Sequence, residues 1–218
     1  MSYSIRLARE EDISQLSEVE KEAFPTTWPP TPFKRELSNT IASFLVAYPV
    51  KVECPDRPSN ISGFPHANAE PTTHKLKQLW RRLTGRSPYV STQTNVESHI
   101  AGYVASWYMT DEAHITGIAV RQSLRGNGLG ELLLIGSIKL ALQRQSRVVT
   151  LEVRVSNYVA QSLYTKYGFS QVGLRRGYYT DNHEDAYIMT TEAITSFEYG
   201  QQLHGLVETY KARHGNPI

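Results

Sequence analysis

Alternating and helical spacings of apolar residues predict most of the secondary structure of this chain. Strands are expected where apolar and β-branched residues cluster, and helices where apolar residues recur every three or four positions. The strands are expected at 3–8, 41–48, 99–109, 112–120, 148–155, 170–176 and 186–191. Helices are expected at 12–23, 31–38, 129–147 and 156–167, and near 203–210. Antiparallel runs with one or two parallel steps predict an α+β fold with a mixed, mostly antiparallel sheet flanked by helices.

Local signals predict where several of these helices begin and end. Thr31 followed by Pro32 is typical of an N-cap and a first helical position, and Ser156 is expected to cap the next-to-last helix. Gly168 is expected to end that helix. Four prolines in the stretch at 24–33 exclude a helix or a central strand through most of it.

The stretch from 49 to 98 differs from the rest of the chain because it shows no strand period and is rich in Pro, Ser, Asn and Thr. We interpret it as a long insertion after the second strand. Within it, the segment 74–86 combines Leu and Trp at helical spacing with five basic and no acidic residues. It is predicted either to contact RNA, a ribosome or anionic lipid, or to dock on the parent domain. We expect one domain at 1–192 and a C-terminal helical extension at 193–218.

The charge, the cysteine count and the distribution of apolar residues limit the classes of protein to which this chain can belong. The chain has 218 residues, a formal net charge of +2 and a single cysteine, Cys54. An intrachain disulfide is therefore impossible, and the small charge does not by itself indicate nucleic-acid binding. No apolar stretch approaches the ~20 residues of a membrane span, and the N-terminus lacks the apolar core of a signal peptide. A cytoplasmic protein without a transmembrane segment is expected.

A glycine-rich loop, VRQSLRGNGLGELLL at 120–134, joins a strand to a helix. Its glycines allow close approach of the backbone, and the helix that follows offers free N–H groups and the positive end of its dipole. This pattern favours a phosphate or pyrophosphate site over a turn without a ligand. Glu131 stands where a P-loop or a dinucleotide fingerprint requires another residue, so both of those motifs are excluded.

Three stretches resemble a known family. Arg125–Gly130 resembles the R/Q-x-x-G-x-G/A signature of GNAT acetyltransferases. LEVRVSNYVAQSLYTKYGF (151–169) and RRGYYTDNHEDAYIM (175–189) resemble more narrowly the ribosomal-protein-alanine N-acetyltransferases of RimI type. The resemblance covers 99–191 well and 3–48 weakly, and it implies the GNAT (acyl-CoA N-acyltransferase) fold.

The resemblance implies acetyl-CoA as cosubstrate and the N-terminal α-amine of a protein, possibly ribosomal, as acceptor. It assigns cofactor binding to ten residues: Ile118, Ala119, Val120, Arg125, Gly126, Asn127, Gly128, Leu129, Gly130 and Asn157. The first three would pair with pantetheine through their backbones, and residues 125–130 would hold the pyrophosphate. It assigns acceptor binding to Phe24, Pro25, Trp28, Tyr178 and Tyr179. No metal is implied, and the His-Glu-Asp sequence at 183–185 is weak evidence for one.

The resemblance also makes Glu152 the general base and Tyr164 the general acid. Acetyl transfer to an amine needs a neutral nucleophile and a proton for the departing thiolate, and a carboxylate and a phenol suit these tasks. The alternatives are an edge charge on Glu152 paired with Arg154, and simple core packing for Tyr164. Glu112 and His114 are further candidate bases.

Two other functions remain open at this stage. A related enzyme could acetylate a lysine side chain or a small-molecule amine. A non-catalytic module could instead bind acyl-CoA and dock on ribosomes through the basic segment.

Overall fold

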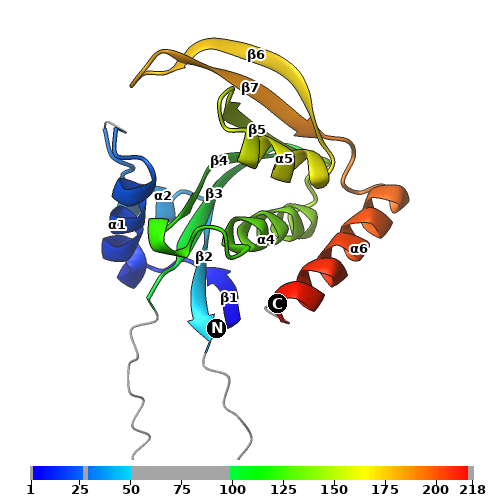
Figure 1. The fold of residues 1–218 in the computed structure, drawn as a ribbon, viewed down its shortest axis with the longest axis horizontal. Coiled ribbons are helices and arrows are strands. Elements are labelled where there is room, and N and C mark those ends of the chain that lie inside the picture. Colours follow the sequence, from blue (N-terminus) through cyan, green and yellow to red (C-terminus); the bar gives the residue numbers. More distant parts are fainter. Residues whose placement is uncertain (1, 27–28, 51–98, 216–218) are drawn as a thin grey trace, which may run out of the picture. The chain divides into compact units, whose positions relative to one another are not determined.

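The computed structural model describes residues 2–26, 29–50 and 99–215, which all belong to one unit of the chain. Its strands are β1 (Ser2–Leu7), β2 (Ala42–Val50), β3 (Gly102–Met109), β4 (Glu112–Val120), β5 (Val148–Arg154), β6 (Phe169–Tyr179) and β7 (Glu184–Thr191). Its helices are α1 (Ile13–Ala23), α2 (Phe33–Leu37), α4 (Leu129–Gln143), α5 (Tyr158–Lys166) and α6 (Phe197–His214), with short 3-10 turns η1 (Glu10–Asp12) and η2 (Gln122–Leu124). This order, shown in Figure 1, confirms the predicted succession of strands and helices.

Some predictions fall outside the described residues. These are Trp28, the basic segment at 74–86 and almost all of the insertion at 49–98, of which only the first two residues are described, as the end of β2. The division between a catalytic domain at 1–192 and an extension at 193–218 also stays a prediction. In the described part of the chain, no helix is long and apolar enough to cross a membrane.

The seven strands form one sheet in the order β1-β2-β3-β4-β5-β7-β6. Every neighbouring pair is antiparallel except β4 and β5, which are parallel. The mixed, mostly antiparallel sheet is therefore confirmed. The parallel pairing is short, since it runs only from Glu112 opposite Val148 to Ile115 opposite Leu151.

A β-bulge explains why β4 and β5 separate beyond this point. Ser106 on β3 lies opposite Ile115 and Ala105 lies opposite Gly117, so Thr116 is the extra residue on β4. A bulge bends its strand and increases the local twist. The remainder of β4 thus stays paired with β3 but turns away from β5, whose other edge pairs with β7 from Thr150 to Arg154.

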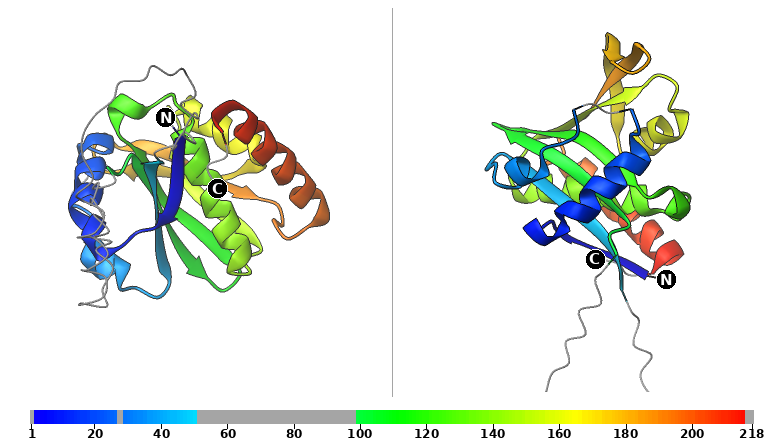
Figure 2. Two further views of the ribbon diagram at one scale, coloured as in Figure 1. Left: turned by 90° about the horizontal axis from the view of Figure 1, so that it is seen from below. Right: turned by 90° about the vertical axis from the view of Figure 1, so that its left-hand side faces the viewer.

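Helices cover both faces of the sheet. Figure 2 shows α1 and α4 on opposite sides of it, and each helix contacts the central strands. Helix α4 is buried nearly all round, beyond the single apolar stripe predicted from sequence. The reason is that α6 belongs to the same apolar cluster, to which it contributes Tyr199, Leu203, Val207 and Tyr210. A helix that is apolar around its whole circumference requires cover on more than one side.

Two of the predicted helix caps are wrong by one residue. Asn157, not Ser156, is the N-cap of α5, and its side-chain oxygen accepts a hydrogen bond of 3.1 Å from the N–H of Ala160. Thr31 lies one residue before the N-cap of α2, and its hydroxyl donates to the buried carboxylate of Glu20. At α5 the neighbouring Asn157 supplies the capping oxygen, whereas at α2 the N-cap is Pro32, which makes no side-chain capping bond.

Candidate active site

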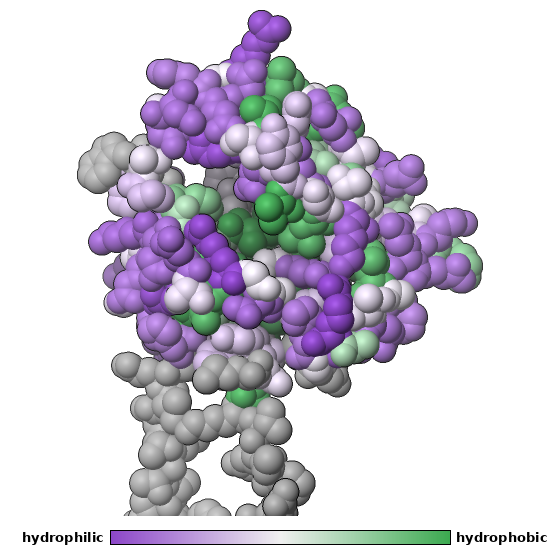
Figure 3. Space-filling view, viewed as in Figure 1, coloured by the Kyte–Doolittle hydropathy of each residue, from purple (hydrophilic) through white to green (hydrophobic). Residues whose placement is uncertain are grey.

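A cleft of about 450 Å³ opens where β4 and β5 separate. Both strands, the loop after α1, the start and inner face of α5 and the β6–β7 loop line it. The lining residues are Ala23, Phe24, Pro25, Thr26, Ile115, Thr116, Gly117, Ile118, Leu151, Glu152, Val153, Arg154, Asn157, Tyr164, Tyr179 and Asp181. In Figure 3 the face viewed is hollowed near its centre, where apolar residues gather inside a hydrophilic border. A mixed apolar and polar lining of this kind is typical of a small-molecule site.

Glu152 lies on the cleft side of β5. Val149, Leu151 and Val153 point from the opposite face of β5 into the core, as the alternation predicted. The Glu152 side chain is only 6% exposed, and its carboxylate lies 3.1 Å from His114 Nε2 and 3.1 Å from a guanidinium nitrogen of Arg175.

The alternative pairing of Glu152 with Arg154 is wrong. Arg154 instead forms ion pairs with Asp181 at 2.8 Å and with Glu184 at 3.1 Å, because it sits at the end of β5 beneath the β6–β7 loop. Hydrogen bonds from Ser156, with a further contribution from Arg154, lower the pKa of Glu184 to about 2.

A hydrogen-bonded chain runs from Glu152 along the paired part of β4 and β5. His114 Nδ1 lies 2.8 Å from the hydroxyl of Thr150, which donates its own proton to Glu112. Thr150 must therefore accept from His114, so Nδ1 carries a proton. Of the three candidate bases, only Glu152 lines the cleft, whereas Glu112 sits partly exposed at the first residue of β4.

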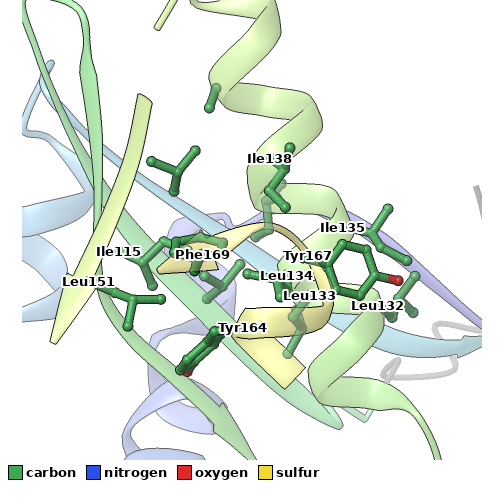
Figure 4. Packing of buried hydrophobic residues seen from close by; sticks show 14 of the residues in the cluster. Ile115, Leu132, Leu133, Leu134, Ile135, Ile138, Leu151, Tyr164, Tyr167 and Phe169 are labelled. Atoms are coloured by element: carbon green, nitrogen blue, oxygen red, sulfur yellow. The ribbon is translucent and has the colours of Figure 1, made fainter. Parts of the chain in front are cut away.

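Tyr164 projects from α5 into the same cleft. Its ring packs against Phe169 with the ring centroids 5.8 Å apart, and the residue is 9% exposed. Figure 4 shows its hydroxyl pointing away from Leu133 and α4. Among the described residues no hydrogen-bond partner engages that hydroxyl, and it is not fully occluded from the cleft. Burial raises the pKa of Tyr164, so its hydroxyl keeps its proton and can act as a donor.

The open edge of β4 offers backbone groups from alternate residues only. The N–H of Arg121 donates to the carbonyl of Ala101, the residue just before β3, and Ala119 lies opposite Tyr103 on β3. Because hydrogen-bonded pairs alternate along an antiparallel ladder, Ala119 directs its backbone groups toward β3. Ile118 and Val120 therefore direct their backbone groups away from β3. The cofactor contact expected of the Ala119 backbone stays a prediction that this pairing does not support, and the Ala119 side chain is buried against the α1 side of the sheet.

The glycine loop has the geometry of an anion site. Gly126 and Gly128 have φ values of +80° and +77°, which L-residues with side chains rarely adopt, and α4 begins directly after Gly128. No described residue accepts from the backbone N–H groups of 126–128, and the first N–H groups of α4 have no partner within the helix. The N–H of Arg125 differs from these groups, because it donates to the carbonyl of Gln122 at 3.3 Å.

Side chains of the loop hold its shape. Asn127 donates to two loop carbonyls, those of Leu124 at 3.1 Å and Arg125 at 3.3 Å. The Arg125 guanidinium donates to the carbonyl of Val120. Asn157, also predicted to bind the cofactor, lines the cleft, and its amide nitrogen remains available because only its oxygen caps α5.

Most of the predicted acceptor residues reach the cleft. Phe24, Pro25 and Tyr179 line it, whereas Tyr178 packs edge-on against Tyr179 with centroids 5.2 Å apart and does not. The cleft is bridged at one side by Thr26, whose hydroxyl donates to Asp181 at 2.8 Å. This bridge links two loops that are 155 residues apart in the chain.

Sequence reasoning missed Arg175 and the Thr26–Asp181 bridge, and it ranked His114 below Glu152. Arg175 lies on β6 and reaches Glu152 on β5 across the intervening β7. Only the strand order brings these side chains together, and no local pattern in the sequence signals that order.

Comparison with known proteins supplies independent evidence. Residues 55–169 match the model of the Acetyltransferase (GNAT) family. A Bacillus subtilis protein, provisionally named ribosomal protein bS18-alanine N-acetyltransferase, is 47% identical over 93 residues, which span 43% of this chain and 62% of that protein. A Sulfolobus acidocaldarius N-alpha-acetyltransferase is 32% identical over 190 residues, 87% of this chain and 92% of that protein. The crystal structure of the Escherichia coli ribosomal-protein-S18-alanine N-acetyltransferase superposes with a TM-score of 0.61 at 22% identity, over 90% of this chain and 97% of that one.

Proposed function

Because the chain belongs to the acetyltransferase (GNAT) family, we propose that it transfers the acetyl group of acetyl-CoA to the N-terminal α-amine of a protein. The names of the Bacillus and Sulfolobus relatives support this acceptor class, and the Bacillus name favours a ribosomal protein. The observation that carries the proposal is the placement of Glu152 and Tyr164 in one cleft, at the point where β4 and β5 diverge.

The described residues fit the two ends of acetyl-CoA. Free N–H groups at 126–130 and the positive end of the α4 dipole would bind the diphosphate. The open edge of β4 at Ile118 and Val120 would receive the pantetheine arm in the manner of an added strand. Both interactions use backbone groups that have no partner within the sheet or the helix, although the Val120 carbonyl accepts from the Arg125 guanidinium.

The reaction then needs two proton transfers. The amine nitrogen attacks the thioester carbonyl, a C–N bond forms and the C–S bond breaks. Glu152 takes the proton that the amine loses, and the thiolate takes a proton from Tyr164. A terminal amine has a pKa near ~7.7–8, well below the ~10.4 of lysine, so a fraction is already neutral at physiological pH. A carboxylate base therefore suffices more readily for an α-amine than for a lysine.

The surroundings of Glu152 suit this role. His114 and Arg175 both approach its carboxylate and hold it in place on the cleft wall. The hydrogen bonds from His114 to Thr150 and from Thr150 to Glu112 hold the His114 ring beside this carboxylate.

Acetylation of a peptide panel tests the proposal. Peptides with free N-termini that differ in the first two residues, one of them led by Ala, are incubated with acetyl-CoA and analysed by mass spectrometry. Each is paired with an N-blocked peptide that contains lysine. We expect modification of the free α-amine only. Modification of the blocked peptides would favour a lysine acetyltransferase, and binding of acetyl-CoA without turnover would favour a non-catalytic module.

A cytoplasmic location follows from a ribosomal acceptor and stays a prediction. Contact with the ribosome through the segment at 74–86 also stays a prediction, since that segment lies outside the described residues.

A further inference from the structure

Helix α6 has no role in the expectations drawn from sequence, and it contacts a glycine with positive φ at each of its ends. Near its start, the Tyr199 ring covers Gly168, where an added Cβ would lie 3.1 Å from the ring, and its hydroxyl donates to the carbonyl of Tyr167. At its end, the His214 imidazole covers Gly128, where an added Cβ would lie 2.7 Å from the ring. Gly168 follows α5, which carries Tyr164, and Gly128 is the N-cap of α4. Helix α6 thus connects the two helices of the proposed site.

The His214 ring has a defined position in this contact. It stacks on Tyr210 one turn earlier, with ring centroids 4.6 Å apart and planes inclined by 30°. Tyr210 is buried in the main apolar cluster. The imidazole therefore lies between a fixed aromatic ring and the backbone of Gly128, and it fills the space that a side chain at position 128 would need.

A second contact joins the same turn of α6 to the first turn of α4. The Arg213 guanidinium lies 3.3 Å from the carboxylate of Glu131, whose side chain is 11% exposed. The same carboxylate accepts from Lys166 and from the hydroxyl of Tyr167 on the α5 side. Burial opposes ionisation of Glu131, but the hydrogen bonds from Lys166 and Tyr167 outweigh it and lower its pKa. An ionised carboxylate next to a diphosphate site requires such neutralising partners.

We propose that α6 is a working part of the cofactor site, in which His214 and Arg213 are positioning residues that hold the glycine loop in the shape required to bind the diphosphate of acetyl-CoA. The inference rests on the proposed function. No residue of α6 lines the cleft that holds Glu152 and Tyr164. The effect of His214 and Arg213 is therefore specific to the nucleotide end of the donor and does not extend to the chemical step.

Two donors separate these ends experimentally. Acetyl-CoA carries the diphosphate, whereas acetyl-pantetheine offers the same thioester and arm without it. For His214→Ala we expect the KM for acetyl-CoA and the Kd for CoA by calorimetry to rise about fivefold, a size typical of coupling between residues in contact. The kcat with acetyl-CoA and the kcat/KM with acetyl-pantetheine should not change. Lys211→Ala is the matched control, since Lys211 lies in the same turn and pairs with Glu208 of its own helix; it should behave as wild type.

A double-mutant comparison tests the contact itself. Gly128→Ala introduces both an unfavourable φ and a collision with His214, whereas Gly126→Ala introduces the unfavourable φ alone, because nothing lies within 4 Å of its added Cβ. The rise in KM caused by G128A should shrink at least about twofold when His214 is also Ala. The rise caused by G126A should be the same in both backgrounds.

The outcomes distinguish this inference from the proposed function. Wild-type protein that neither binds CoA nor acetylates any N-terminal peptide would overturn the proposed function. Wild-type protein that binds CoA, together with an H214A variant that binds it equally well, would overturn the role of α6 alone. Equal losses with acetyl-CoA and acetyl-pantetheine would also overturn it, because they would indicate a general structural role.

Discussion

Replacement of Glu152 by Gln removes the charge of the proposed base while keeping its size and one acceptor oxygen. The carboxylate is 6% exposed, so the substitution leaves no cavity. The Arg175 side chain is 53% exposed, so water can solvate its guanidinium when residue 152 becomes neutral. The His114 side chain is only 19% exposed, so its imidazole depends more on its contact with residue 152. We expect the free energy of unfolding to fall by only about 1 kcal/mol, the usual net value of one hydrogen bond.

The loss of activity should be much larger. General-base assistance contributes about 10²- to 10⁴-fold to a rate. The lower end of this range applies here. An α-amine with a pKa near ~7.7 is roughly one-sixth neutral at pH 7, and that fraction can attack without a base. We therefore expect kcat/KM of E152Q to fall about 100-fold, equivalent to about 2.7 kcal/mol of transition-state stabilisation.

The pH dependence identifies the cause. Without a base, the variant must use amine that is already neutral, and that fraction rises about fivefold between pH 7 and pH 8.7. The kcat/KM of E152Q should rise by the same factor, while that of the wild type should rise less. The assay is steady-state acetylation of an Ala-led peptide at both pH values, with the Kd for acetyl-CoA and the melting temperature as controls for binding and folding.

Glu112→Gln provides the comparison that could refute this reasoning. Glu112 is 39% exposed and does not line the cleft, so we expect its activity to stay within about twofold of wild type. An E152Q variant with nearly wild-type kcat/KM would remove Glu152 as the base. A loss in E112Q equal to that in E152Q would move the base function to Glu112.

Further predictions concern the acid, the cleft wall and the support of α1. Tyr164→Phe should lower kcat about 100-fold. The melting temperature and the KM for acetyl-CoA should change little, because no described residue engages the Tyr164 hydroxyl. An unchanged kcat would exclude Tyr164 as the acid. Glu184, whose pKa is lowered from 4.5 to about 2, stabilises the folded chain above pH 4.5, and this contribution is lost as the pH falls toward about 2. The melting temperature of Glu184→Gln should therefore lie below that of wild type at pH 6, and the difference should close in acid; a constant difference would contradict the assignment. Arg121→Ala should lower the free energy of unfolding, measured in urea, by about 2 kcal/mol. The reason is that the buried guanidinium bonds to a backbone carbonyl and to two α1 carboxylates. A decrease of less than about 0.5 kcal/mol would mean that these bonds contribute little.

The sequence by itself determined the order of the strands and helices and the two faces of β5. These features depend on short-range rules: the period of apolar residues, the stiffness of proline and the freedom of glycine. The same rules predicted an anion site at the glycine loop, because the helix that follows must leave its first N–H groups unpaired. The resemblance of short motifs then singled out Glu152 and Tyr164, and the structure brings both to the same cleft.

Only the tertiary structure decided what surrounds those residues. The bulge at Thr116 separates β4 from β5, and the strand order places Arg175 beside Glu152 across β7. The end of α6 meets Gly128, which lies 86 positions before His214 in the chain. Such contacts join residues far apart in sequence, and their geometry depends on how strands pair and helices pack. No local period encodes that information, so the sequence could predict the reacting groups but not the side chains that lie around them.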